Sequence, residues 1–192
     1  ETYAKVHQCD PADFDRVIKN IELLVETREK KGYSSTIGVQ MVLLYENTDE
    51  ALVLGEKLKS LGADYLVIKP YSQHKSSNTR QYEKIDYEKN LTLEDDLANL
   101  NGDGFNVIYR KLTIQRAIAN EYDFKTCHST PFFWAYIMAS GDVYGCSAYL
   151  EDKRFCYGNI SENSFQKIWE GEERRKNFHF IRDELDKLCI FK

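Results

Sequence analysis

Apolar residues in the first half of the chain follow helical and extended spacings in turn. Where they recur every three or four positions, the spacing predicts amphipathic helices. Where they form nearly continuous runs rich in β-branched residues, they predict strands that are covered on both faces. The predicted segments alternate as helix, strand, helix and strand at 13–31, 36–44, 48–61 and 65–71.

Two apolar strands that flank one amphipathic helix form a β–α–β unit. Such strands are parallel and are joined by a right-handed crossover. The predicted fold class is therefore α/β, with β/α units of a half-barrel or of a doubly wound sheet. In these folds, catalytic and ligand-binding residues lie at the carboxyl ends of the strands. The polar side chains at those ends are Glu46, Lys69, Gln73 and His74. For Lys69 and His74, the competing interpretation is a solvated loop.

The second half of the chain shows a different organisation. Segment 81–126 carries weaker patterns, which predict a helix near 92–100, a strand at 105–109 and a helix at 112–119. Beyond it, two short runs separated by a Ser140-Gly141-Asp142 turn predict a hairpin. Capping residues then precede two helices, one that carries Phe165 and Trp169 and a charged one after Gly171. We therefore expect α+β character at the C-terminus.

Composition limits the possible functions. The formal net charge of −5 argues against a nucleic-acid-binding surface as the main function. No apolar run approaches the roughly 18–20 residues of a membrane span, and the first residues lack a signal-peptide pattern. These features predict a cytoplasmic protein. Five cysteines without a secretion signal favour reduced thiols and metal over a disulfide framework.

The cysteines suggest a metal centre. A hairpin brings its ends together, so Cys127 and Cys146 can reach one metal, and thiolates suit zinc or iron–sulfur clusters. Cys189 is the candidate third ligand, and a fourth ligand is still needed. The competing interpretation is that these cysteines are small buried apolar residues. Cys156 is a possible fourth ligand, although a buried structural role is favoured for it.

The spacing around these cysteines resembles a known family. Thirteen residues separate Cys127 from Gly141 and four separate Gly141 from Cys146. Farther on, the sequence reads Tyr157-Gly158-Asn159-Ile160, then Ser164-Phe165 and Ile168-Trp169. Both features resemble the SPASM or twitch domains of radical S-adenosylmethionine (SAM) enzymes. The resemblance implies an auxiliary [4Fe–4S] cluster held by Cys127, Cys146 and Cys189. In the family a cysteine follows Cys189 after two residues, whereas this chain has Lys192.

The same resemblance implies a partial (β/α)6 barrel ahead of the cluster domain. Segments 36–44 and 65–71 resemble its fifth and sixth strands, and residues 1–6 resemble the stretch after its fourth strand. The C-x3-C-x2-C loop of the SAM-cleaving cluster has no counterpart in this sequence. We therefore expect the C-terminal part of a longer enzyme, inactive by itself, whose parent uses SAM and a second [4Fe–4S] cluster. The expected domains are 1–80 (barrel units), 81–126 (bridge) and 127–192 (cluster module).

In the full-length relatives, a 5′-deoxyadenosyl radical abstracts a hydrogen atom from the substrate. The resemblance implies that Glu46, Lys69, Gln73 and His74 face the substrate. It does not indicate whether the substrate is a peptide, a sugar or another small molecule. The expected partners include no nucleic acid and no membrane, and an exposed barrel edge predicts a homodimer. The alternatives are a zinc-stabilised scaffold and a metal-free α/β interaction module, neither of them catalytic.

Overall fold

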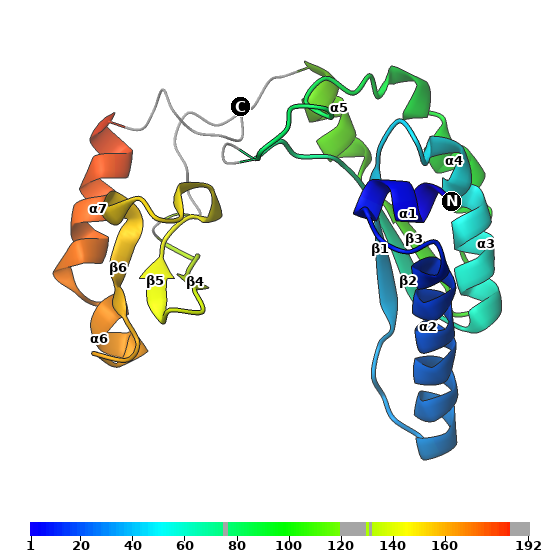
Figure 1. The fold of residues 1–192 in the computed structure, drawn as a ribbon, viewed down its shortest axis with the longest axis horizontal. Coiled ribbons are helices and arrows are strands. Elements are labelled where there is room, and N and C mark those ends of the chain that lie inside the picture. Colours follow the sequence, from blue (N-terminus) through cyan, green and yellow to red (C-terminus); the bar gives the residue numbers. More distant parts are fainter. Residues whose placement is uncertain (75–76, 120–129, 131, 185–192) are drawn as a thin grey trace. The chain divides into compact units, whose positions relative to one another are not determined.

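The computed structural model describes residues 1–74, 77–119, 130 and 132–184 (Figure 1). The chain divides into two compact units, one of residues 1–73 and 79–120 and the other of residues 74–78 and 121–192. The first unit contains a parallel sheet of three strands, and the second a small antiparallel sheet of three strands. The predicted α/β class, with a separate hairpin module, is confirmed.

The parallel sheet is built from the predicted apolar runs. Its strands are β1 (Gly38–Leu43), β2 (Tyr65–Pro70) and β3 (Asn106–Tyr109), in that order across the sheet. In register, Val39 lies opposite Leu66, which in turn lies opposite Val107. The segment at 105–109 therefore extends the predicted β–α–β unit by one parallel strand.

Four of the described helices pack on the buried face of this sheet (Figure 1). They are α2 Ala12–Lys31, α3 Ala51–Leu61, α4 Leu93–Ala98 and α5 Lys111–Ala119. The short helix α1 (Thr2–His7) contacts α2, and 3-10 turns lie at Thr48–Glu50 and Glu88–Asn90. Ile21 of α2 and Leu58 of α3 belong to one core with Leu43 and Ile68 of the strands. The helix that joins β1 to β2 ends at Gly62, whose φ of 81° closes it in the left-handed conformation, as the sequence predicts.

The prediction that the strand at 36–44 is covered on both faces is wrong for β1, and β3 is likewise open on one face. Alternate residues of each strand remain accessible, among them Gln40 and Ile108, the latter 47% exposed. The reason is that Met41, Leu43, Leu66 and Ile68 all meet the helices on one face. The described helices thus form a single layer, as in a half-barrel and unlike a doubly wound sheet. The described strands do not close a barrel.

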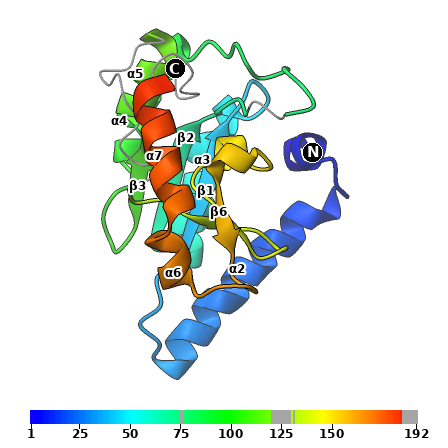
Figure 2. The same ribbon diagram turned by 90° about the vertical axis from the view of Figure 1, so that its left-hand side faces the viewer.

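The second unit contains the predicted hairpin and helices (Figures 1 and 2). Its elements are β4 Tyr136–Ile137, β5 Asp142–Tyr144, β6 Cys156–Asn159, α6 Phe165–Trp169 and α7 Glu172–Glu184, with 3-10 turns at Ser147–Tyr149 and Lys153–Phe155. The hairpin turns at Gly141, whose φ is 87°. α7 packs beside β6 (Figure 2). Cys127, which the sequence places at the end of the first hairpin arm, lies outside the described residues.

Elements of the predicted bridge at 81–126 belong to the first unit. They are β3, α4 and α5, and Leu97 of α4 and Ile114 of α5 are buried in the core of that unit. The three-part division of the chain stays a prediction. None of the described helices has the length and apolar character needed to cross a membrane.

Candidate metal centre

Of the three cysteines expected to hold the cluster, Cys127, Cys146 and Cys189, the structure describes Cys146. It follows β5 in extended conformation, with φ −149° and ψ 131°, and begins the 3-10 turn Ser147–Tyr149. Its half-buried side chain packs against the cluster of Tyr144, Phe155 and Ile181. Among the described residues, its thiol has no hydrogen-bond partner. The side chain is therefore held by packing, while its sulfur is not committed to another polar group.

Thr130 connects the chain that follows Cys127 to the residue before Cys146. Its side chain is only 4% exposed, and its Oγ1 donates a hydrogen bond of 2.7 Å to the carbonyl oxygen of Gly145. Gly145 leaves no room for a side chain, because a Cβ would lie 3.2 Å from Cγ2 of Thr130 and collide with the Tyr157 hydroxyl. Sequence reasoning missed Thr130, since a threonine near a cysteine carries no specific signal.

Two predicted ligands, Cys127 and Cys189, lie outside the described residues. Within residues 1–74, 77–119, 130 and 132–184, no group of three or more His, Cys, Asp or Glu side chains could hold a metal ion. The donor chemistry nevertheless fits an iron–sulfur cluster, because Cys146 and Cys156 are both free thiols in the hairpin unit. The predicted ligand set stays a prediction.

Cys156 begins β6, directly opposite Tyr144 of β5. It is half-buried, and its Sγ lies 3.9 Å from the carbonyl oxygen of Gly158, which is a weak contact for a thiol. The ladder is irregular between Val143 and Tyr144, where β6 carries one extra residue, Tyr157. This bulge turns Tyr157 toward the core of Val143 and Ile168, while Cys156 packs with the Tyr144 cluster.

Asn159 fixes the hairpin turn. Its Nδ2 donates to the carbonyl oxygen of Ser140 at 3.1 Å and to Oδ1 of Asp142 at 2.9 Å. Its Oδ1 accepts a hydrogen bond of 2.8 Å from the backbone N–H of Ser161. Hydrogen bonds from Ser140 and then Asn159 lower the pKa of the Asp142 carboxyl below its ordinary value. The Gly-Asn pair of the motif thus has a structural role, joining β6 to the turn at Gly141.

The end of the motif packs α6 on the sheet. Ser164 caps the helix by accepting a 3.3 Å hydrogen bond from the backbone N–H of Lys167, as its sequence position predicts. Ile168 is buried against Val143 and Tyr157. Trp169 is half-buried, and the guanidinium of Arg174 lies 3.9 Å from the centre of its ring. The motif residues Ser164 to Trp169 therefore support the sheet that carries the cysteines.

Glu46 lies just beyond the carboxyl end of β1. Its Oε1 accepts a hydrogen bond of 3.2 Å from the Tyr82 hydroxyl and lies 3.8 Å from Nζ of Lys5. Its Oε2 is buried and has no hydrogen-bond partner among the described residues. Burial, followed by the charge of Glu46 and its hydrogen bond, raises the pKa of Tyr82 above its ordinary value. A buried carboxylate oxygen without a donor is costly, which sets Glu46 apart from an ordinary loop residue.

The other predicted substrate-facing residues occupy different positions. Lys69 lies within β2, opposite Val42 of β1 and half-buried. Gln73 follows β2 and donates a 3.2 Å hydrogen bond to the carbonyl oxygen of Thr79. His74 belongs to the second unit, where its Nε2 lies 3.0 Å from the carbonyl oxygen of Ser147. A substrate role for these residues stays a prediction.

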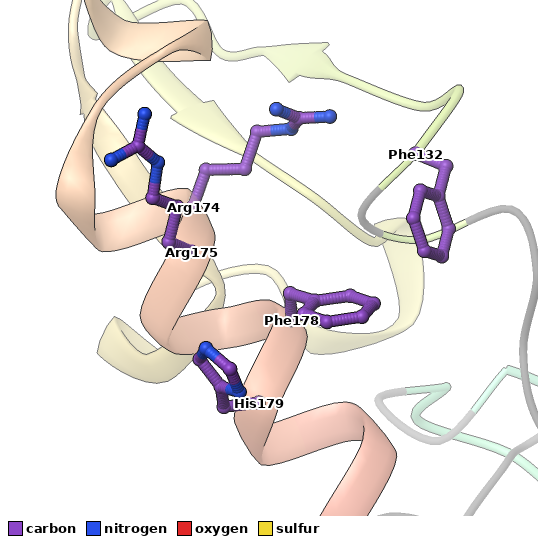
Figure 3. A pocket seen from close by; sticks show the side chains of 5 residues that line it. All are labelled: Phe132, Arg174, Arg175, Phe178 and His179. Carbon is purple, nitrogen blue, oxygen red and sulfur yellow. The ribbon is translucent and has the colours of Figure 1, made fainter.

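A pocket of about 190 Å³ opens on α7 (Figure 3). It is lined by Phe132, Arg174, Arg175, Phe178 and His179. The rings of Phe132 and Phe178 meet edge to face, with their centres 5.2 Å apart. Because Arg174 also donates to the carbonyl oxygen of Trp169 at 2.8 Å, one of the two guanidinium groups already has a structural role.

The geometry defines an α/β protein with a small antiparallel module that carries free thiols. A comparison with known families assigns that module: residues 127–190 match the SPASM family, described as an iron–sulfur cluster-binding domain. The resemblance inferred from the cysteine and glycine spacing is confirmed. SPASM domains bind iron–sulfur clusters and are found in radical SAM enzymes. Searches of curated proteins and of solved structures gave no significant match.

Proposed function

We propose that this chain is the C-terminal part of a radical SAM enzyme and that its second unit binds an auxiliary [4Fe–4S] cluster. The proposed ligands are Cys127, Cys146 and Cys189. The observation that carries the proposal is the match of residues 127–190 to the SPASM domain, since this range includes all three cysteines. Thiolates are the usual ligands of such clusters.

The Thr130 hydrogen bond supports a shared site for the first two ligands. Thr130 is bonded to Gly145, the residue before Cys146. Because a chain advances at most about 3.6 Å per residue, the three residues from Thr130 back to Cys127 span at most roughly 11 Å. Cys127 is thus three residues from one partner of this hydrogen bond and Cys146 is next to the other, which supports the proposal that both bind one cluster.

The parallel strands of the first unit support the radical SAM part of the proposal. Three parallel strands with one layer of helices are the local architecture of a partial barrel. In such barrels the active site lies at the carboxyl ends of the strands. Glu46, Lys69, Gln73 and His74 are proposed as substrate-facing residues. Glu46 has the strongest support, because its buried Oε2 finds no donor in the part of the chain that the structure describes.

The proposed chemistry belongs to the parent enzyme. There, SAM and a second [4Fe–4S] cluster would supply the radical chemistry by which hydrogen is abstracted from the substrate. This sequence has no C-x3-C-x2-C motif, so the chain by itself is expected not to cleave SAM. The auxiliary cluster would supply a substrate ligand or an electron acceptor. Cys146 and its packing partners Tyr144 and Phe155 would hold it at one side of the hairpin.

The test is a cluster assay on the 192-residue chain reconstituted without oxygen. Iron and acid-labile sulfide are counted, and ultraviolet–visible and electron paramagnetic resonance (EPR) spectra are recorded. The matched comparison is between Cys127→Ala/Cys146→Ala and Cys9→Ala, since Cys9 lies in the first unit, outside the SPASM match. We expect a brown protein whose cluster signal vanishes in the double variant and persists in Cys9→Ala.

Other outcomes would contradict the proposal in different ways. A colourless protein with one zinc ion that the double variant loses would indicate a structural zinc site instead. A protein without metal would assign the cysteines to packing. A cluster that survives in the double variant would show that other residues hold it.

A further inference from the structure

The ladder between β5 and β6 places a further cysteine beside the proposed cluster ligand. Cys156 lies directly opposite Tyr144, and Cys146 follows Tyr144 by two residues. Beyond that pair, the backbone N–H of Gly145 donates to the carbonyl oxygen of Phe155 at 2.9 Å, so the two segments are still paired at Gly145, the residue before Cys146. In a regular ladder, diagonal neighbours are separated by roughly 7–8 Å between their Cα atoms, and Cys146 follows β5 directly in extended conformation.

Both cysteines pack against the same buried residues. Tyr144, Phe155 and Ile181 form the cluster that Cys146 and Cys156 both border, and both side chains are half-buried. Opposed residues of an antiparallel pair project to the same face of a sheet, so Cys156 shares the face of Tyr144. The bulge at Tyr157 preserves this arrangement, because it sends the Tyr157 side chain to the other core and leaves Cys156 beside Tyr144.

Among the described residues, the Cys156 thiol makes one weak hydrogen bond. Its described hydrogen bond is a 3.9 Å contact from Sγ to the carbonyl oxygen of Gly158, a residue of its own strand. Thiols are weak donors, so loss of this contact on deprotonation would cost little. The sulfur is thus available as a thiolate ligand. The sequence alone favoured a buried structural role for Cys156. In the structure its side chain is only half-buried.

We infer that Cys156 supplies a fourth thiolate to the same cluster as Cys146. The inference rests on the proposed function, and it completes a ligand set of four cysteines, the usual number for a [4Fe–4S] cluster. The ligands of the cluster would then be Cys127, Cys146, Cys156 and Cys189. Cys9, in the other unit, would be the cysteine of the chain that does not.

The test uses Cys156→Ser and Cys156→Ala in the reconstituted 192-residue chain, with Cys9→Ser as the matched control. We expect Cys156→Ala to hold about one iron fewer per chain and to show the EPR signal of an oxidised three-iron cluster. Serine preserves the volume and offers an oxygen ligand, so Cys156→Ser is expected to keep the fold and to alter the EPR spectrum. Cys9→Ser is expected to match the wild type in iron content and spectrum.

The outcomes separate this inference from the proposed function. Wild-type iron content and an unchanged spectrum in a folded Cys156→Ser protein would overturn the ligand role of Cys156 and leave the cluster proposal intact. A wild-type chain that takes up no cluster would overturn both. Circular dichroism confirms the fold of each variant, and Cys156→Ser, as the conservative change, decides the result if Cys156→Ala does not fold.

Discussion

The phenol of Tyr157 donates a hydrogen bond of 3.0 Å to Oδ1 of Asn177, and both side chains are buried. Asn177 in turn donates from Nδ2 to the carbonyl oxygen of Arg154 at 2.7 Å. Tyr157 lies in β6 and Asn177 in α7, so this pair fastens the C-terminal helix to the sheet that carries Cys146 and Cys156. Partners on both sides of the Asn177 amide account for its burial in an otherwise charged helix.

Replacing Tyr157 with Phe removes this hydrogen bond and leaves a buried acceptor unpaired. We expect the free energy of unfolding to fall by about 1–3 kcal/mol. Urea unfolding measures the change. Tyr33→Phe is the control, because that ring is 54% exposed and surface substitutions usually change the free energy by less than about 0.5 kcal/mol. Equal, small effects of the two substitutions would show that the Asn177 contact contributes nothing.

Gly141→Ala tests the packing of Asn159 on the hairpin turn. The substitution places a Cβ 2.7 Å from Oδ1 of Asn159 at a φ of 87°. Gly104 is a matched control, because its φ is 84° and nothing lies within 4 Å of the added Cβ. Backbone strain alone should cost each variant about 1–2 kcal/mol. We expect thermal unfolding to show a larger loss for Gly141→Ala, and equal losses would contradict the predicted collision.

The Asp142 carboxylate should make the hairpin sensitive to acid. Hydrogen bonds from Ser140 and Asn159 lower its pKa in the folded state, so the unfolded state takes up the proton first as pH falls. The stabilisation is therefore present above the unfolded value of about 3.9 and lost as pH falls through the folded pKa. Ser140→Ala removes the first of these donors.

We expect Ser140→Ala to lower the melting temperature near neutral pH and to converge with the wild type once the pH has fallen below the lowered pKa of Asp142, where the carboxyl group is protonated in both proteins. Melting curves at several pH values measure this. A difference that stays constant from neutral to acid pH would assign the effect of Ser140 to something other than the Asp142 charge.

The parallel sheet predicts self-association. β1 and β3 each pair with β2 alone within the described sheet, so each has an edge that can pair with another chain. We expect light scattering to show a concentration-dependent dimer and amide exchange to show slowed exchange at one of these edges. A monomer at all concentrations, with no edge protection, would contradict the prediction.

Local sequence patterns determined the elements and much of the candidate site. The apolar runs at 36–44 and 65–71 predicted β1 and β2, and glycine at position 62 predicted the end of α3, because periodicity and backbone conformation are local properties. The spacing of Gly141 and Cys146 indicated the cluster domain, because this spacing also depends on local backbone conformation. A tight turn needs its glycine at a fixed distance from the strand ends.

The tertiary structure decided which faces are covered and which polar groups are paired. Gln40 and Ile108 lie on an open face because the described helices gather on the other, and a continuous apolar run does not reveal such an arrangement. Thr130 and Asn177 look like ordinary polar residues in the sequence. They matter because their hydrogen-bond partners lie 15 and 20 residues away along the chain, and only folding brings these groups together.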